Sequence, residues 1–360
     1  MIDGSSVFVI AEAGVNHNGS VEMAIQLVDA AKEAGADAVK FQTFKAENLV
    51  SKFAEKADYQ QQFTDASENQ FEMLKKLELS ELDHQNIFNH CTTVGIRFMS
   101  SPFDHVSLDM LVNSFDLPLL KLGSGELTNA PLLLAAARSG KPIILSTGMS
   151  TLAEIEEALS VIAFGYLNSN DSPGIEAFKH AFNSENGKSL LRKNIVLLHC
   201  TTEYPSPYSE VNLRAMDTLK KTFGFPVGYS DHTDGWVIPL AAVARGARVI
   251  EKHFTMSRDL PGPDHAASLE PDELKKMVHA IRQVELSLGS REKEPTASEL
   301  RNMKVARKSL VALKAIKQGE SFTEENITVK RPGIGIPPIQ FWVYHGEVAD
   351  RSYSEDELIQ

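Results

Sequence analysis

A short apolar run, a polar tip and an amphipathic stretch repeat eight times along the chain, and this repetition restricts the fold more than any other feature. The runs cover residues 7–14, 38–44, 97–103, 119–126, 142–149, 194–200, 226–232 and 248–254. Most are separated by stretches with apolar residues at helical spacing, such as Ala24, Leu27, Val28 and Ala31 ahead of a helix-ending Gly35. Eight buried strands alternating with helices predict a (β/α)8 TIM barrel rather than an open doubly wound sheet.

The chain continues beyond the eighth run, and its character changes there. We predict a barrel domain over residues 1–288, a polar linker over 289–303, and a small domain rich in short β-strands over 304–360. Within the barrel, the polar segments 45–79 and 166–193 are unusually long connections. Ordered loops of such length usually serve as lids or as subunit contacts.

Composition excludes several classes of partner. The net charge of -12 argues against nucleic-acid binding, which needs a basic face, but not against a small anion bound in a local pocket. The N-terminal apolar run VFVIA is too short to cross a membrane, and no basic leader precedes it. Cys91 and Cys200 show no pairing or metal-ligand spacing, which is typical of reduced thiols. We therefore expect a cytoplasmic protein with no membrane partner.

Polar side chains follow each apolar run, and in a barrel such positions converge on one mouth. They are Glu12, Asn16, His17, Lys40, Gln42, Ser101, Asp104, Lys121, Ser124, Glu126, Ser146, Thr147, His199, Thr201, Thr202, Ser230, His232 and His253. Taken singly, either lysine is more often solvated or ion-paired. Lys40 and Lys121 at neighbouring strand ends, with Ser124 and Ser146, predict an anion site that suits a phosphate.

His232 and His253 end adjacent strands of the predicted barrel. A lone strand-end histidine is usually structural, but two together could bind one divalent metal and leave coordination positions open for a substrate. Asp231 is a candidate to orient a neighbouring ring. Glu12 is the candidate general acid or base, with a salt bridge to a barrel lysine as the structural alternative.

Many of these residues lie in motifs that resemble one family. IAEAGVNHNG, KFQTF, SSPFD, KLGSGE, LSTGM, LLHCTTEYP, GYSDHT, EKHFT and GPDH are similar to motifs of the bacterial sialic acid (N-acylneuraminate) synthases, including the legionaminic acid synthases. The tail RKSLVALKAIKQGESFTEENITVKRPGIGI resembles their antifreeze-like (SAF) domain. The resemblance extends over nearly the whole chain.

The resemblance implies that phosphoenolpyruvate condenses with an open-chain 2-acetamido sugar, with release of phosphate. A divalent metal, Mn²⁺ in preference to Mg²⁺ or Co²⁺, would activate the aldehyde. The implied catalytic residues are Glu12, His232 and His253, with both histidines as metal ligands. The implied substrate-binding residues are Lys40, Gln42, Ser101, Lys121, Ser124, Ser146, Thr202, Tyr204, Ser230, Asp264 and Arg331. Thr202 stands where the family has asparagine, and SSPF where it has STPF.

The resemblance also bears on the sugar and on assembly. The tyrosine of GYSDHTDGW and the long segment before LLHCTTEYP favour 2,4-diacetamido-2,4,6-trideoxymannose, the legionaminic acid precursor, over N-acetylmannosamine. Arg331 implies a domain-swapped homodimer, in which the tail domain of one subunit reaches the partner's site. Alternatives are a pseudaminic acid or spore-coat polysaccharide synthase, a barrel metallohydrolase or a glycan-binding protein.

Overall fold

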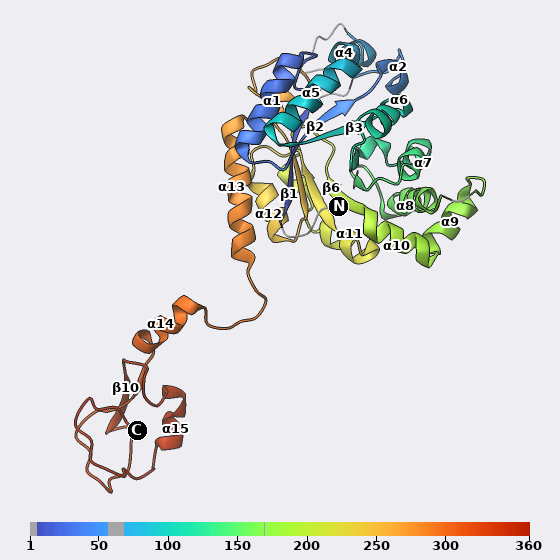
Figure 1. The fold of residues 1–360 in the computed structure, drawn as a ribbon. Helices are drawn as coiled ribbons and strands as arrows, with labels where there is room; N and C mark the ends of the chain where they lie inside the picture. Colours follow the sequence, from blue (N-terminus) through green and yellow to red (C-terminus); the bar gives the residue numbers. More distant parts are fainter. Residues whose placement is uncertain (1–5, 57–67, 169) are drawn as a thin grey trace. The chain divides into compact units, whose positions relative to one another are not determined.

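The computed structural model describes residues 6–56, 68–168 and 170–360 (Figure 1). The chain divides into two compact units, Met1–Gly289 and Ser290–Gln360. Each unit has its own hydrophobic core.

Eight parallel strands build the first unit. They are β1 (Phe8–Gly14), β2 (Ala38–Thr43), β3 (Arg97–Pro102), β4 (Leu120–Leu122), β5 (Ile143–Ser146), β6 (Ile195–Cys200), β7 (Val227–Asp231) and β8 (Val249–His253). Their order in the sheet is β3-β2-β1-β8-β7-β6-β5-β4, and the end strands β3 and β4 contact each other. The sheet is therefore a nearly closed barrel, which confirms the predicted fold class.

Helices surround the barrel (Figure 1). They are α1 (Val21–Ala34), α2 (Ala46–Leu49), α4 (Gln70–Leu77), α5 (Glu81–Val94), α6 (His105–Asp109), α7 (Ala130–Arg138), α8 (Leu152–Leu167), α9 (Ile175–Asn183), α10 (Glu185–Asn194), α11 (Ala215–Phe223), α12 (Val237–Ala244) and α13 (Pro271–Leu288), with a π-helical turn at Met110–Ser114 and 3₁₀ turns at Ser124–Glu126, Tyr208–Glu210 and His265–Ala267. Side chains at their starts explain several boundaries. Ser20 accepts a hydrogen bond from the Met23 amide, and α1 ends at Gly35 in the left-handed conformation, as predicted.

The alternation of side chains along the strands produces two apolar layers. Inside the barrel lie Ile10, Ala38, Met99, Leu119, Ile144, Val196, Leu198 and Val249. A larger cluster outside the strands packs against the helices. Most interior apolar residues precede a polar residue by two positions, as Ile10 precedes Glu12 and Ala38 precedes Lys40. Because side chains of a strand alternate with period two, the barrel interior is apolar toward the strand starts and polar toward the strand ends.

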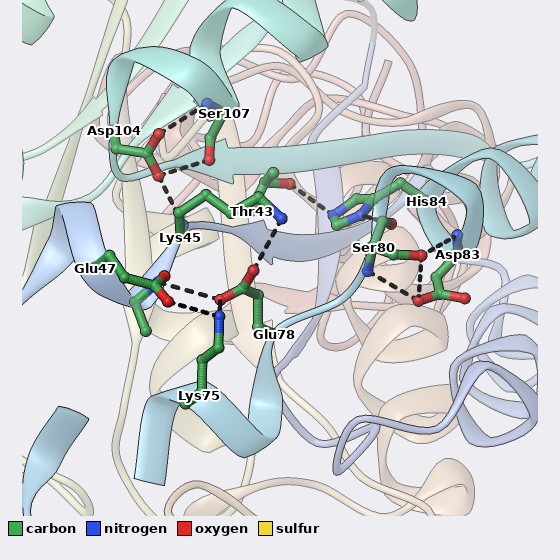
Figure 2. A network of polar contacts seen from close by, with 11 residues as sticks. Thr43, Lys45, Glu47, Lys75, Glu78, Ser80, Asp83, His84, Asp104 and Ser107 are labelled. Carbon is green, nitrogen blue, oxygen red and sulfur yellow. Dashed lines mark hydrogen bonds and ion pairs between the residues drawn. The ribbon is translucent and has the colours of Figure 1, made fainter. Parts of the chain in front are cut away.

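The connection after β2 packs against the mouth of the barrel. Phe44 and Met73 belong to a small apolar cluster with Phe103 beside it. Figure 2 shows the polar contacts of Lys45 and Asp104, which are the chain neighbours of Phe44 and Phe103. Asp104 accepts hydrogen bonds from the Lys45 amide at 2.8 Å and from the Ser107 hydroxyl at 2.7 Å, and Glu78 accepts from Lys45 Nζ at 2.8 Å. The segment 45–79, predicted as a lid or subunit contact, is thus joined to the end of β3, although residues 57–67 lie outside the described residues.

The other long segment, 166–193, contains all of α9 and all but the last residue of α10, and both helices pack on α8. None of the helices in the described ranges combines the length and the apolarity that a membrane span requires.

The second unit contains α14 (Ala297–Ala306), the antiparallel strands β9 (Ser309–Ala312) and β10 (Ile327–Lys330), a 3₁₀ turn at Pro338–Gln340 and α15 (Phe341–Tyr344). Its core comprises Leu310, Ala312, Ile316, Phe322, Ile327, Ala349, Tyr353 and Ile359. The polar linker predicted over 289–303 did not include a helix, yet α14 begins there. A capping box of Thr296 and Glu299 starts this helix, and its polar, exposed composition concealed it in the sequence.

Candidate active site

A cavity at the carboxyl ends of the strands brings together all but two of the predicted site residues. It is lined by Glu12, Lys40, Gln42, Ser101, Phe103, Lys121, Gly123, Ser124, Gly125, Ser146, Cys200, Thr202, Tyr204, Ser230, His232, Glu251 and His253. These residues come from all eight barrel strands or from the loops that follow them. The barrel topology therefore assembles side chains that are more than 200 positions apart in the chain.

Two lysines and two glutamates form a buried charged group in this cavity. Lys40 Nζ lies 2.6 Å from Glu12 Oε2 and 3.7 Å from Glu251 Oε2. Lys121 Nζ lies 3.3 Å from Glu251 Oε1. The strand register explains the first contact, since Glu12 and Lys40 are directly paired between β1 and β2. Charges buried so deeply are costly unless they are paired, so this group is typical of a functional site.

The carboxyl groups of Glu12 and Glu251 differ in pKa. Burial raises the pKa of Glu12 to about 7, although Lys40 acts in the opposite direction. Burial alone would also raise the pKa of Glu251, but the ammonium groups of Lys121 and Lys40 outweigh it and bring the pKa to about 2. Near neutral pH the group therefore carries two ammonium charges, one full carboxylate charge and one partial one. This excess of positive charge suits an anion.

Hydroxyl groups and a backbone amide line the same part of the cavity. Ser101 Oγ accepts a hydrogen bond from Lys40 Nζ at 3.0 Å, and Ser124 Oγ accepts one from the Gly148 amide at 2.9 Å. Ser146 Oγ has no hydrogen-bond partner among the described residues. A Cβ on Gly148 would lie 2.5 Å from Thr202 Oγ1, so only glycine allows this close approach. A buried hydroxyl without a partner is available to a ligand.

The two histidines lie side by side on the cavity wall. Their ring centroids are 5.5 Å apart. His232 Nδ1 donates to the Thr201 carbonyl at 2.6 Å, which leaves the lone pair on Nε2, where the Tyr204 hydroxyl lies at 3.1 Å. Burial lowers the pKa of His232 to about 4 and that of His253 well below its usual value. Both rings are therefore neutral, as metal ligands must be.

These residues fit a divalent metal with few protein ligands. His253 Nδ1 is buried without a hydrogen-bond partner in the described part of the chain, and His232 Nε2 offers a lone pair nearby. No group of three or more histidine, cysteine or acidic side chains suited to a metal occurs among residues 6–56, 68–168 and 170–360. The two histidine nitrogens are fewer than the four or more ligands usual in barrel metallohydrolases, and they leave coordination positions open for a substrate.

Two predicted site residues do not line the cavity. Asp264 is buried beside His253, with its Oδ2 3.9 Å from His253 Nδ1, and burial raises the pKa of Asp264 to about 6. Arg331 belongs to the second unit, where its Nε donates to the Ala306 carbonyl at 3.1 Å and its side chain is exposed.

Asp231 does not orient a histidine ring, contrary to the sequence interpretation. Its carboxylate faces Lys252, 2.7 Å away, while the Thr201 carbonyl binds the His232 ring. Alternation along β7 explains this, because Ser230 and His232 face the cavity and Asp231 faces the opposite side. Tyr229, the tyrosine used to favour the legionaminic branch, is also fully buried and does not line the cavity.

Glu251 is the principal residue that the sequence analysis missed. It accepts a hydrogen bond from Ser230 Oγ at 2.8 Å and contacts both lysines. The spacing in the sequence could have identified Glu251, because it precedes His253 by two positions and therefore faces the same side of β8.

Other strand-end side chains have structural partners instead. Asn16 donates to the Phe254 carbonyl, Asp104 caps α6, Thr147 donates to the Leu198 carbonyl, Glu126 accepts from Asn129, and His199 contacts the Val211 carbonyl.

Comparisons with known proteins match both units. The NeuB family model matches residues 27–293, and the SAF domain model matches residues 307–360. The N,N'-diacetyllegionaminic acid synthase of Campylobacter jejuni is 49% identical over 98% of this chain and 98% of that protein. The protein of the same name from Legionella pneumophila is 48% identical over 93% of this chain and 88% of its own length. The crystal structure of the N-acetylneuraminic acid (sialic acid) synthetase from Leptospira borgpetersenii, in complex with citrate, has a TM-score of 0.66 at 35% identity and covers 83% of this chain and 91% of that one.

Proposed function

Because this chain belongs to the NeuB family and resembles named synthases over nearly its full length, we propose that it is a nonulosonic acid synthase that condenses phosphoenolpyruvate with an open-chain acetamido sugar and releases phosphate. The observation that carries the proposal is the buried group of Lys40, Lys121, Glu12 and Glu251 beside two neutral imidazoles. It combines an anion site, a carboxyl group that titrates near neutral pH, and metal ligands within one cavity.

Each charge that phosphoenolpyruvate carries, or that develops during the reaction, has a complementary residue in this cavity. Lys40 and Lys121, with Ser101, Ser124, Ser146 and Ser230 nearby, bind the phosphate and carboxylate of phosphoenolpyruvate. Its C3 attacks the aldehyde carbon, and a proton from Glu12 converts the aldehyde oxygen into a hydroxyl group. Cationic character develops at C2, where the Glu251 carboxylate stabilises it. Water then adds at C2 and gives one proton to Glu12. Cleavage of the bond between C2 and the phosphate oxygen releases phosphate, which takes the second proton and leaves a ketone at C2.

We propose that His232 and His253 bind a divalent metal, Mn²⁺ in preference to Mg²⁺ or Co²⁺. A metal held there would polarise the sugar's aldehyde. The hydrogen bond from His232 Nδ1 to the Thr201 carbonyl keeps the lone pair on Nε2, where a metal would take the place of the Tyr204 hydroxyl contact, and Asp264 Oδ2 lies 3.9 Å from His253 Nδ1.

We propose 2,4-diacetamido-2,4,6-trideoxymannose as the sugar, which gives N,N'-diacetyllegionaminic acid. The two named legionaminic acid synthases support this choice through identities of 49% and 48%. N-acetylmannosamine, which would give N-acetylneuraminic acid, is the second candidate because the Leptospira neighbour carries that activity in its name. The test offers each sugar to the purified protein with phosphoenolpyruvate and Mn²⁺ and measures phosphate release and product mass. Release with neither sugar would contradict the proposal.

We also propose a cytoplasmic homodimer in which Arg331 of one subunit contacts the sugar in the partner's barrel. The exposure of Arg331 supports this, since no ion pair engages its guanidinium among the described residues. The unpaired thiols of Cys91 and Cys200 suit a reducing compartment.

A further inference from the structure

A buried ion pair lies behind the two histidines and has no role in the chemistry above. Lys252 Nζ is 2.7 Å from Asp231 Oδ2, and neither side chain is exposed. Lys252 Nζ also donates to the Thr233 carbonyl, and the Thr233 hydroxyl donates to Asp231 Oδ1 at 2.9 Å. The ammonium group is thus bound by Asp231 and Thr233, the two residues that flank His232.

Strand register makes this contact a link between both candidate metal ligands. Asp231 and Lys252 are directly paired between β7 and β8. Each precedes one of the histidines by a single residue. Because neighbouring side chains of a strand face opposite sides, the ion pair lies on the helix side of the sheet while His232 and His253 face the cavity.

Stability alone does not account for such a pair. Two charges removed from water lose much of their hydration, and replacement of a buried ion pair by apolar residues of similar volume is often neutral or stabilising. A paired charge does specify geometry, because any shift between the strands leaves a buried charge without its partner. A fixed alignment of β7 and β8 is needed here, because two ligands on adjacent strands must keep their separation to bind one ion.

We propose that Lys252 and Asp231 are positioning residues that fix the relative placement of His232 and His253. Lys252 binds the Asp231 carboxylate on one side of His232 and the Thr233 carbonyl on the other, and Asp231 keeps Lys252, and therefore His253, in register. The inference rests on the proposed metal ligation by the two histidines.

The test replaces the pair without leaving a single buried charge. In the double variant Asp231→Leu with Lys252→Met, two apolar side chains take the place of the ion pair. A second double variant, Asp231→Asn with Lys252→Gln, keeps hydrogen-bonding groups and guards against a failure of the first to fold. Ile250→Val alters the same strand on the same side and serves as the matched control. Each protein is measured for thermal stability, for Mn²⁺ affinity by calorimetry, and for phosphoenolpyruvate affinity without metal.

We expect the apolar double variant to fold and to bind phosphoenolpyruvate within about twofold of wild type, while Mn²⁺ affinity falls by roughly 10–100-fold. The Asn/Gln variant should recover part of that loss, and Ile250→Val should match wild type. Mn²⁺ affinity within threefold of wild type in both double variants would overturn the positioning role. An equal loss of Mn²⁺ and phosphoenolpyruvate binding would overturn it as well, because it would indicate general disruption.

Two further measurements separate this inference from the proposed function. His232→Ala tests ligation itself, and unchanged Mn²⁺ affinity in that variant would reject the metal site whatever the ion pair does. Histidine ring signals in the NMR spectrum of the metal-free protein test positioning without any metal. We expect the His232 and His253 signals, assigned with the alanine variants, to shift or broaden in the apolar double variant while the His17 signal stays in place. Unchanged His232 and His253 signals would contradict the inference even if no metal bound.

Discussion

Lys40 Nζ lies 2.6 Å from Glu12 Oε2, at the point where β1 and β2 are in direct register. The lysine proposed to bind phosphoenolpyruvate is therefore already paired with the carboxyl group proposed to transfer a proton. On the proposed function, an incoming phosphoenolpyruvate would compete with Glu12 for Lys40 and release Glu12 to act on the sugar. Substrate binding and proton transfer would then be linked through this one contact.

The first prediction follows from that link. Glu12→Gln removes the competing negative charge, so phosphoenolpyruvate should bind at least as tightly as in wild type. Turnover should fall by roughly 10²–10⁴-fold because the proton donor is lost. Calorimetry and steady-state kinetics measure the two effects. Weaker phosphoenolpyruvate binding with normal turnover would assign Glu12 to the structure of the site rather than to catalysis.

Lys40→Ala and Lys121→Ala should each weaken phosphoenolpyruvate binding by about 2–3 kcal/mol, since charge-assisted hydrogen bonds are lost. The KM for the sugar, measured at saturating phosphoenolpyruvate, should change less. Lys45→Ala is the control, because this lysine is ion-paired to Glu78 and does not line the cavity. If the sugar KM rises instead, the lysines bind the other substrate.

His232→Ala and His253→Ala should abolish metal-dependent turnover while the protein stays folded, because both rings line a cavity rather than pack in the apolar core. Removal of metal by a chelator should also abolish turnover of the wild-type protein. Added Mn²⁺ should then restore the activity of wild type but not that of the two variants. Circular dichroism serves as the folding control. Near-normal turnover of either variant after chelation and Mn²⁺ addition would reject the ligand assignment.

Assembly is tested by complementation. Arg331→Ala and Glu12→Ala subunits should be inactive alone, but a mixed dimer that exchanges tails contains one intact site. Random exchange should then restore about a quarter of wild-type activity. If each tail serves its own barrel, every site carries a defect and the mixture stays inactive. No recovery despite demonstrated subunit exchange would therefore exclude the swap.

Stability should decrease as the pH falls below 6.5. Burial lowers the pKa of His17 from 6.5 to about 4, so the unfolded state takes up a proton that the folded state refuses. The neutral His17 ring therefore contributes its full share to the free energy of unfolding above the unfolded-state pKa. This share is lost as the pH falls toward the folded-state pKa, and the loss between pH 7 and pH 5 is about 2 kcal/mol. Denaturant unfolding at both pH values measures it. His17→Gln should reduce this pH dependence, whereas the exposed His279→Gln should not. Equal pH dependence in all three proteins would refute the assignment to His17.

The sequence alone determined the barrel and its family. Two periodicities, near two in the strands and near 3.6 in the helices, are local properties that persist in the fold because burial depends on them. Position at a strand end then placed Glu12, Lys40, Lys121, His232 and His253 at one mouth, since parallel barrel strands all end on the same side.

Only the tertiary structure decided which of these side chains contact one another. Glu251 was missed and Asp231 misassigned because their partners, Lys121 and Lys252, depend on strand register and on the side of the strand each residue faces. The helix α14 was missed because its polar surface lacks the apolar period of a packed helix. Contacts between residues far apart in the chain follow from pairing and burial in three dimensions, which local spacing does not specify.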